Sequence, residues 1–363
     1  MRKITRRSFL AAAAVCGAAA ALTACGVSSA SSTAASSVAS SAAAGSAAAS
    51  GDTYTIGICQ LVQHAALDAA TQGFEDALTA EFGDNVKFDF QNAQNDSATC
   101  ATIANGFVSA GVDLIMANAT PALQAAQAAT NSIPILGTSV TEYGVALGLT
   151  DFDGTVGGNV SGTSDLAPLD QQAEMITEWL PDVKKVGLLY DVGQDSSTKP
   201  IADAKAYLEA KGIEVIERTG TTVDEVTLAA KALVSDGVQA VFTPTDNTIM
   251  KSELSIYEIF ADAKIPQYAG ADSFALNGAF LGYGVDYAKL GVETANMIID
   301  IMINGKDPAT TPVLMFDNGT ATINTEICAK LGYNFDEVSK LFAPKCTEVK
   351  SITTAESFSD VQQ

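Results

Sequence analysis

Three polar residues, Thr245, Asp246 and Asn247, come shortly after an apolar, β-branched run at 238–242. A carboxylate beside hydroxyl and amide groups can bind a small polar ligand, and Asp246 can pair with a cationic group that is removed from water. The competing interpretation is helix capping, because Thr, Asp and Asn are common N-cap residues. The turn alone therefore indicates either a binding site or a cap.

The same pattern occurs a second time in the chain. Residues 111–121 (GVDLIMANATP) match residues 237–247 (GVQAVFTPTDN) in their Gly-Val start, apolar run and polar end. Strand-like starts at 56–58 and 186–188, and Ile-Pro pairs at 133–134 and 265–266, repeat with similar spacing. Two similar α/β halves are therefore predicted. Because open α/β sheets bind ligands at the carboxyl ends of their strands, strand ends that face each other would form a cleft.

Strands and helices alternate along both halves. Apolar runs predict strands at 54–61, 86–91, 114–117, 133–137 and 145–149, and then near Val186, Val215, Val241, Tyr268 and Leu281. Helical spacing predicts helices at 64–81 and 98–110, and Pro121 fits the first turn of the next helix. Repeated βαβ units predict doubly wound parallel sheets with helices on both faces.

The elements after Gly284 are too short to enclose a third core, so we expect them to complete the first two lobes. They are a helix at 287–304, short strands near 313–316 and Ala321, and a helix at 324–331. The N-terminal lobe would comprise 53–163 and 286–317, and the C-terminal lobe 164–285 and 318–346, followed by a polar tail at 347–363. Three crossings near 161–165, 284–286 and 317–319 would form the hinge.

The start of the chain indicates export. Residues 1–24 combine a basic start, an apolar Ala-rich stretch and a lipobox that ends at Cys25, which is typical of a bacterial lipoprotein signal peptide. Cys25 would then carry the lipid and become the first mature residue. The Arg6-Arg7 pair leaves twin-arginine export open beside the general route. The Ala/Ser-rich stretch up to residue 52 is predicted to be a flexible tether.

Charge and cysteine content limit the function classes. The net charge is −22, and removal of the four positive charges in the signal peptide leaves −26. No basic face is available for phosphates, so a nucleic-acid partner is not expected. Cys59 is expected to be a buried free thiol, whereas Cys328 and Cys346 could form a disulfide outside the cytoplasm. No Cys or His cluster predicts a metal site, and no cofactor is expected.

Several motifs together resemble the type I periplasmic binding proteins, and within them the ABC importer lipoproteins that bind tryptophan and other aromatic amino acids. The similarity covers about 54–345 and rests on QLVQHAALDAA (60–70), ATPALQAA (119–126), TSVT (138–141), GTSDLAPLDQQ (162–172), PTDNT (244–248) and YGVDYAKLG (283–291). The resemblance implies two lobes that close on a small solute and deliver it to a membrane permease. A monomer anchored to the outer face of the cell membrane is expected.

Candidate ligand-binding residues follow predicted strands or lie at the crossings. In the first lobe, two strand exits, Thr120-Pro121 and Ser139-Val140-Thr141, offer hydroxyls and free backbone N–H groups that could bind a carboxylate. Asp246 is the candidate partner for an amino acid ammonium, and Asp272 or Asp286 could share that role. Helix capping is the alternative for Thr120, Ser164, Asp165 and these acidic residues. The remaining candidates are Gln63, His64, Ser196, Ser197, Thr245, Asn247 and Gly284.

The same residues limit the other function classes. An enzyme is not expected, because the chain lacks a GxSxG elbow, a dinucleotide fingerprint and a phosphate loop, and its single histidine cannot build a triad. An aromatic or aliphatic L-amino acid is the expected ligand. A sugar or nucleoside receptor on the same fold, or a sensor that docks onto a membrane signalling protein, remains an alternative.

Overall fold

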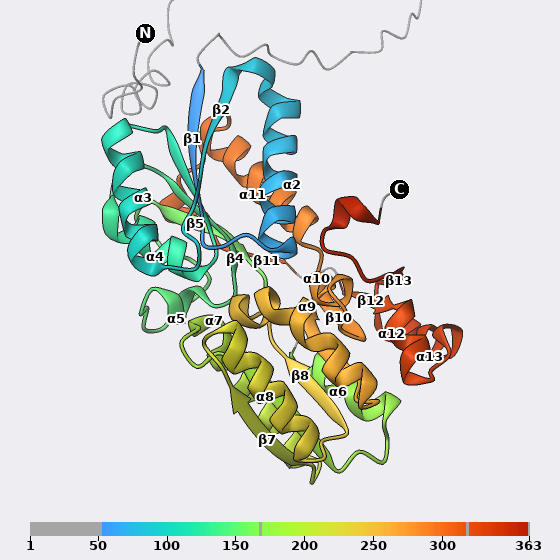
Figure 1. The fold of residues 1–363 in the computed structure, drawn as a ribbon. Coiled ribbons are helices and arrows are strands. Elements are labelled where there is room, and N and C mark those ends of the chain that lie inside the picture. The colour runs from blue at the N-terminus through green and yellow to red at the C-terminus, as the bar shows by residue number, and fades with distance from the viewer. Residues whose placement is uncertain (1–52, 167–168, 317–318, 362–363) are drawn as a thin grey trace, which may run out of the picture. The chain divides into compact units, whose positions relative to one another are not determined.

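The computed structural model describes residues 53–166, 169–316 and 319–361. The predicted signal peptide, Cys25 and the tether lie outside these residues. The described chain contains two separate β-sheets, each with helices on both faces (Figure 1). The prediction of two α/β lobes is confirmed.

The N-terminal lobe is built on a six-stranded, all-parallel sheet in the order β11-β5-β4-β3-β1-β2. Its strands are β1 (Tyr54–Gln60), β2 (Val86–Asn92), β3 (Leu114–Asn118), β4 (Ile135–Val140), β5 (Val160–Ser164) and β11 (Leu314–Met315). Its helices are α2 (Ala65–Phe82), α3 (Ser97–Ala110), α4 (Thr120–Ala129), α5 (Tyr143–Ala146) and α11 (Tyr287–Met302). Strand faces alternate, so β1 directs Ile56 and Ile58 toward α2 and α11 and directs Cys59 toward α3.

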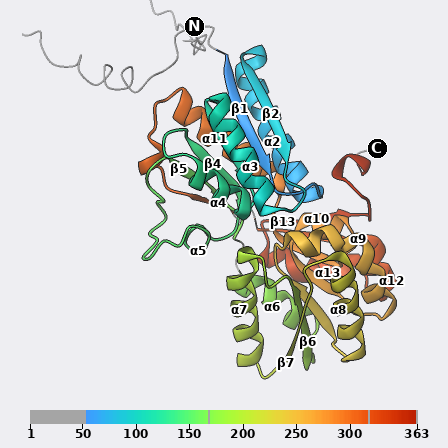
Figure 2. The same cartoon turned by 60° about the vertical axis from the view of Figure 1, so that its left-hand side comes forward.

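The C-terminal lobe contains a seven-stranded sheet in the order β13-β12-β10-β9-β8-β6-β7, in which only the β10–β12 pair is antiparallel. Its strands are β6 (Lys185–Tyr190), β7 (Glu214–Thr219), β8 (Ala240–Thr243), β9 (Gln267–Ala271), β10 (Leu281–Val285), β12 (Thr320–Asn324) and β13 (Glu348–Ile352). Its helices are α6 (Leu169–Trp179), α7 (Asp195–Ala210), α8 (Val223–Ser235), α9 (Asn247–Asp262), α10 (Asp272–Leu276), α12 (Thr325–Leu331) and α13 (Phe335–Phe342). Figure 2 shows α6 and α7 beside strands β6 and β7.

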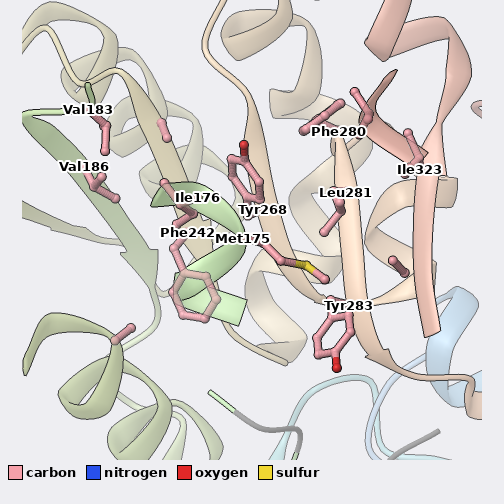
Figure 3. Packing of buried hydrophobic residues seen from close by; sticks show 14 of the residues in the cluster. Met175, Ile176, Val183, Val186, Phe242, Tyr268, Phe280, Leu281, Tyr283 and Ile323 are labelled. Carbon is pink, nitrogen blue, oxygen red and sulfur yellow. The ribbon is translucent and has the colours of Figure 1, made fainter. Parts of the chain in front are cut away.

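The C-terminal core is continuous across the sheet. Phe242 on β8, Tyr268 on β9 and Leu281 on β10 form a row that packs with Met175 and Ile176 of α6 (Figure 3). Each of these side chains is at most 2% exposed. Rigid packing of this kind holds the strand ends, and hence the loops that follow them, in fixed positions.

Three sequence-based expectations differ from the structure. The expected strand at 145–149 overlaps helix α5, which Glu142 caps through its side chain. The strand that pairs with β4 is instead β5, whose small and polar residues carry no apolar run to predict it. Part of the expected polar tail at 347–363 forms β13, which pairs with β12 and extends the sheet. Its polar and exposed residues, among them Glu348 and Ser351, leave no apolar run that would predict this strand.

Helices α2 and α11 lie side by side although they are distant in sequence (Figure 1). A Cβ atom on Gly291 of α11 would lie 2.0 Å from the carbonyl oxygen of Ala70, so only glycine permits this approach. We therefore expect Gly291→Ala to lower the free energy of unfolding by about 1–3 kcal/mol through overpacking. Denaturant titration measures this change.

Gly106 provides the matched control for that substitution. It lies inside α3, and a Cβ atom there would meet nothing within 4 Å. Alanine is the better helix former, so Gly106→Ala is expected to raise the free energy of unfolding by about 0.5–1 kcal/mol. Equal effects of the two substitutions would contradict the packing argument.

Candidate functional site

The predicted site residues lie after the carboxyl ends of strands from both lobes. In the N-terminal lobe these strands are β1, β3, β4 and β5, and in the C-terminal lobe they are β6, β8, β9 and β10. Carboxyl ends of parallel strands meet at one edge of a sheet, which is where open α/β sheets bind ligands. Residues that are up to 183 positions apart in the sequence are thereby brought into direct contact.

Hydrogen bonds connect the two lobes at this edge. His64 Nε2 lies 3.1 Å from Asn247 Oδ1, and Asn247 Nδ2 donates to Gln194 Oε1 at 3.1 Å. The hydroxyls of Thr141 and Thr245 lie 3.3 Å apart. The lobes therefore contact each other through residues that sequence analysis had assigned to the site.

A small pocket lies at this contact. Its lining includes Thr141 and Asp165, which follow β4 and β5 of the N-terminal lobe, and Gln172 and Thr245 from the C-terminal lobe. The apolar part of the lining comes from Leu166, Pro200, Pro244 and Gly270. Gly270 lets Thr245 approach β9, because a Cβ atom there would lie 2.8 Å from Thr245 Cγ2. The pocket thus combines one buried carboxyl group with neutral polar and aliphatic groups.

Several buried polar atoms near these strand ends have no hydrogen-bond partner in the described part of the chain. Three are hydroxyl oxygens, on Thr120, Ser139 and Ser196. Three are acceptor oxygens, namely Asp165 Oδ1, Gln172 Oε1 and Asp272 Oδ1. Leaving a buried polar group unpaired costs about 1–3 kcal/mol, so such a concentration is expected where a polar ligand binds.

Backbone strain accompanies two of these positions. Ala119, directly before Thr120, has φ 88°, and Ser139 has φ 55°, in the left-handed region that residues other than glycine rarely adopt. The pairing register of β4 with β5 shifts between Gly137 and Val140, which is a β-bulge around Ser139. Bulges next to binding sites re-aim side chains, and this one places the Ser139 hydroxyl.

Thr120 does not cap its helix. The N-cap residue of α4 is Ala119, which offers no side-chain acceptor, and the Thr120 hydroxyl is buried without a partner. The first N–H groups of α4 therefore lack a side-chain cap, and Pro121 occupies the first turn as predicted. An uncapped helix N-terminus with a free hydroxyl is suited to an anionic group.

Asp246, in contrast, is a helix cap. Its Oδ1 accepts hydrogen bonds from the backbone N–H groups of Thr248 and Ile249, at 2.9 and 3.0 Å. Its Oδ2 accepts from the Asp191 N–H at 2.8 Å and from the Ser197 hydroxyl at 2.6 Å. Burial raises the pKa of Asp246 to about 6, and these hydrogen bonds oppose that rise. With both oxygens occupied by its own lobe, Asp246 is poorly placed to receive a ligand ammonium.

Asp165 has the free acceptor that Asp246 lacks. It is 2% exposed, and its Oδ2 accepts a 2.6 Å hydrogen bond from the Tyr287 hydroxyl, while Oδ1 is unpaired. Burial raises the pKa of Asp165, and the side chains of Tyr287 and Thr141 oppose the rise. Neighbouring Ser164 binds the Thr141 carbonyl and the Leu166 N–H. A ligand cation would compensate the burial of this carboxylate.

Two further carboxylates lie near the second crossing. Burial and the negative charge of Asp286 raise the pKa of Asp272 to about 8. Asp286 caps α11 by accepting from the Lys289 N–H, and its Oδ2 lies 3.4 Å from Lys350 Nζ on β13. Capping is thus confirmed for Asp286, and Asp272 retains one unpaired oxygen.

His64 combines a local and a long-range role. Its Nδ1 accepts from the Leu67 N–H at 3.4 Å and caps α2, so the proton resides on Nε2, which faces Asn247. Burial at the lobe contact lowers the pKa of His64 to about 4, and the nearby charge of Lys251 adds to this. The His64 ring is therefore neutral when the two lobes are in contact.

The remaining predicted residues have structural partners. Gln63 is exposed and accepts from Asn92 Nδ2, and Gly284 pairs with Thr320 inside the second sheet.

Sequence reasoning missed Gln172, Gln194 and Tyr287. Gln172 and Tyr287 lie inside the motifs at 162–172 and 283–291. Their polar groups at helix positions resembled ordinary surface residues, so only the motifs could have indicated them.

Comparison with known proteins identifies the family. Residues 55–345 match the model of the ABC transporter substrate binding protein family. This chain belongs to that family. It is 37% identical over 305 residues to the tyrosine-binding protein of Clostridioides difficile, covering 83% of this chain and 86% of the relative. The predicted membership in this family is confirmed.

Solved structures of ABC transporter substrate-binding proteins agree with the two-lobed fold. A Streptococcus pneumoniae ABC domain in complex with L-Trp is 32% identical to this chain, with a TM-score of 0.75. The match covers 82% of this chain and 100% of the Streptococcus chain. A ligand-free, open substrate binding protein from Clostridium difficile is 35% identical, with a TM-score of 0.63 and coverage of 84% and 100%. The complex overlaps better than the open structure despite its lower identity.

Substrate-binding proteins of ABC importers act outside the cytoplasm, and this location therefore applies to the family member described here. Across residues 53–166, 169–316 and 319–361, no helix combines the length and the apolar character needed to cross a membrane. Cys328 and Cys346 are both free thiols in the structure, and a disulfide between them stays a prediction.

Proposed function

We propose that this protein binds a free aromatic L-amino acid, tyrosine or tryptophan, and presents it to the permease of an ABC importer without chemical change. The unpaired buried polar atoms at the strand ends carry this proposal, because hydroxyl donors and carboxyl acceptors both occur among them. A free amino acid has a carboxylate for the hydroxyl donors and an ammonium group for the carboxyl acceptors. The names of the relatives that bind tyrosine and L-Trp support the same ligand class.

The ammonium group is assigned to Asp165 rather than to Asp246. Asp165 lines the pocket and has an unpaired Oδ1, and Gln172 offers a second unpaired acceptor in the same lining. A charge-assisted hydrogen bond inside a buried pocket is roughly twice as strong as a neutral one. Asp272, with its unpaired Oδ1, is the next acceptor in the neighbourhood.

The carboxylate group is assigned to the hydroxyls of Thr120, Ser139 and Ser196. They come from the start of α4, from β4 and from the start of α7, so this group would connect both lobes. The uncapped start of α4 adds backbone donors and a favourable dipole. A ligand can drive closure only through contacts that it makes in the closed form, and contacts to both lobes meet this requirement.

Membrane attachment through Cys25 is part of the same proposal. The lipobox at 22–25 and the Ala/Ser-rich stretch that follows would hold the binding domain near the permease. Cys25→Ala is therefore expected to move the protein from the membrane fraction to the soluble extracytoplasmic fraction. Equal membrane retention of both forms after cell fractionation would contradict the lipid anchor.

Isothermal titration calorimetry tests the ligand. The chain from Thr53 onward is unfolded and refolded to remove carried-over ligand and is then titrated with amino acids, sugars and nucleosides. One-to-one binding of tyrosine or tryptophan is expected, and a micromolar complex corresponds to about 8 kcal/mol. A negative heat-capacity change should accompany burial of the aromatic ring. Binding of sugars or nucleosides alone would reject the amino acid assignment and leave the family unchanged.

A further inference from the structure

Two cysteines meet in the core of the N-terminal lobe. Cys59 on β1 and Cys100 on α3 each have 0% exposure and belong to one apolar cluster. The two thiols influence each other, which raises the pKa of Cys59 and lowers that of Cys100, and both are free in the structure. Neither thiol takes part in the ligand site described above.

The packing of α3 on β1 fixes this meeting (Figure 2). The Phe107 ring covers Gly57 so closely that a Cβ atom on Gly57 would lie 2.7 Å from it. Cys59 is two residues beyond Gly57 and therefore on the same face of the strand. Cys100 is seven residues, two helical turns, before Phe107 and therefore on the same face of the helix. Because α3 runs antiparallel to β1, both cysteines lie on the same side of the Gly57–Phe107 contact.

We propose that Cys59 and Cys100 are a disulfide site that is oxidised outside the cytoplasm. Disulfides persist in that compartment, and the family location places this chain there. The bond would close a loop of 41 residues between β1 and the start of α3. It would also support the 61–64 segment, since Leu61 O accepts from Asn95 N at 2.7 Å just before α3.

The oxidant is an external disulfide, carried by a thiol–disulfide oxidoreductase or a small thiol. Cys100 thiolate attacks one sulfur of that disulfide, forms a mixed disulfide and expels one thiolate. Cys59, after losing its proton, attacks Cys100 Sγ and expels the second thiolate. The two cysteine protons go to the two released thiolates, so the pair is oxidised by two electrons and the external disulfide is reduced.

Burial of the two thiols determines when the disulfide can form. Both thiols are inaccessible once α3 has docked on β1, so exchange is expected during folding after export. For the same reason the closed disulfide would resist reducing agents in the folded protein. Disulfides that connect distant residues stabilise chiefly by restricting the unfolded chain.

The test uses the exported chain, recovered from the membrane fraction in which the proposed lipid anchor holds it. It is denatured in iodoacetamide without reduction and mapped by mass spectrometry. A Cys59 peptide linked to the Cys100 peptide, about 2 Da lighter than the sum of the two free peptides, is the expected result. The Cys328→Ala chain should retain this link, which excludes scrambling with the second cysteine pair. Carbamidomethyl groups on both Cys59 and Cys100 would overturn the proposal.

Thermal melting of the parent chain provides a second measurement. The oxidised protein is compared with a reduced form of the same chain. The reduced form is prepared by unfolding the protein with a reducing agent and refolding it in the presence of that agent, without alkylation. The midpoint of the reduced form is expected about 5 °C lower or more. Cys100→Ala should melt at the same temperature with and without reductant. A reductant-independent midpoint for the parent chain would count against the disulfide.

Discussion

Asp165→Asn is expected to weaken binding of the amino acid by about 30-fold or more, because removing one partner of a buried charge pair costs about 2–5 kcal/mol. Asparagine has nearly the same shape and cannot carry a negative charge. The ligand-free protein should lose little stability, since burial already disfavours the Asp165 carboxylate. Calorimetric titration with tyrosine and tryptophan measures the affinity, and thermal melting measures the stability.

Asp246→Asn is the matched control, because it makes the same chemical change in a carboxylate that serves its own lobe. An amide nitrogen in place of Oδ2 would face the Asp191 N–H donor, so the loss should be about 1–3 kcal/mol of stability. Its effect on affinity should be the smaller of the two. If Asp246→Asn abolished binding while Asp165→Asn retained it, the ammonium would belong to Asp246 and our reassignment would fail.

Ligand affinity is expected to fall about tenfold between pH 7.5 and 5.5. The pKa of His64 drops from 6.5 to about 4 at the lobe contact, whereas in an open cleft the exposed ring keeps its ordinary value. Below about pH 6.5 the open form therefore binds more protons than the closed form, and protonation favours opening. Protonated Nδ1 can no longer accept the Leu67 N–H, which removes the cap of α2 as well.

The control for this effect is His64→Asn, which retains a capping side chain and does not titrate in this range. Its affinity should change about tenfold less than that of the parent chain over the same pH interval. Protonation of Asp165 at low pH would contribute equally to both proteins, so the difference between their profiles isolates His64. Parallel profiles would show that the His64–Asn247 contact does not govern closure.

Sequence patterns predicted most of the architecture because the signals are local. Apolar runs of 4 to 7 residues marked most of the strands, and Asp96, Asp246, Asp286 and Asn324 are N-caps in the structure. The repeat of 111–121 at 237–247 indicated two halves with facing strand ends. Strands β5 and β13 escaped detection because polar or exposed residues fill them, and pairing with neighbours, rather than composition, makes them strands.

For the candidate site too, the sequence predicted some features and only the structure decided the others. Residue types and positions by themselves predicted which strand ends carry polar groups, because the carboxyl end of a parallel strand is a property of chain order. Whether each group is free could be decided only in three dimensions. Asp246 and Asp165 are the same residue type after comparable strands, yet four donors of its own lobe surround Asp246 and one oxygen of Asp165 remains unpaired.

The sequence by itself thus determined the compartment signals, the acidic charge, the two-lobed α/β class and the chain segments that border the cleft, since each depends on local pattern or on order along the chain. Only the tertiary structure decided which carboxylate can receive a cation, that His64 reaches Asn247, and that Cys59 faces Cys100. These pairings join residues 41 to 183 positions apart, and their geometry depends on how helices pack on both sheets.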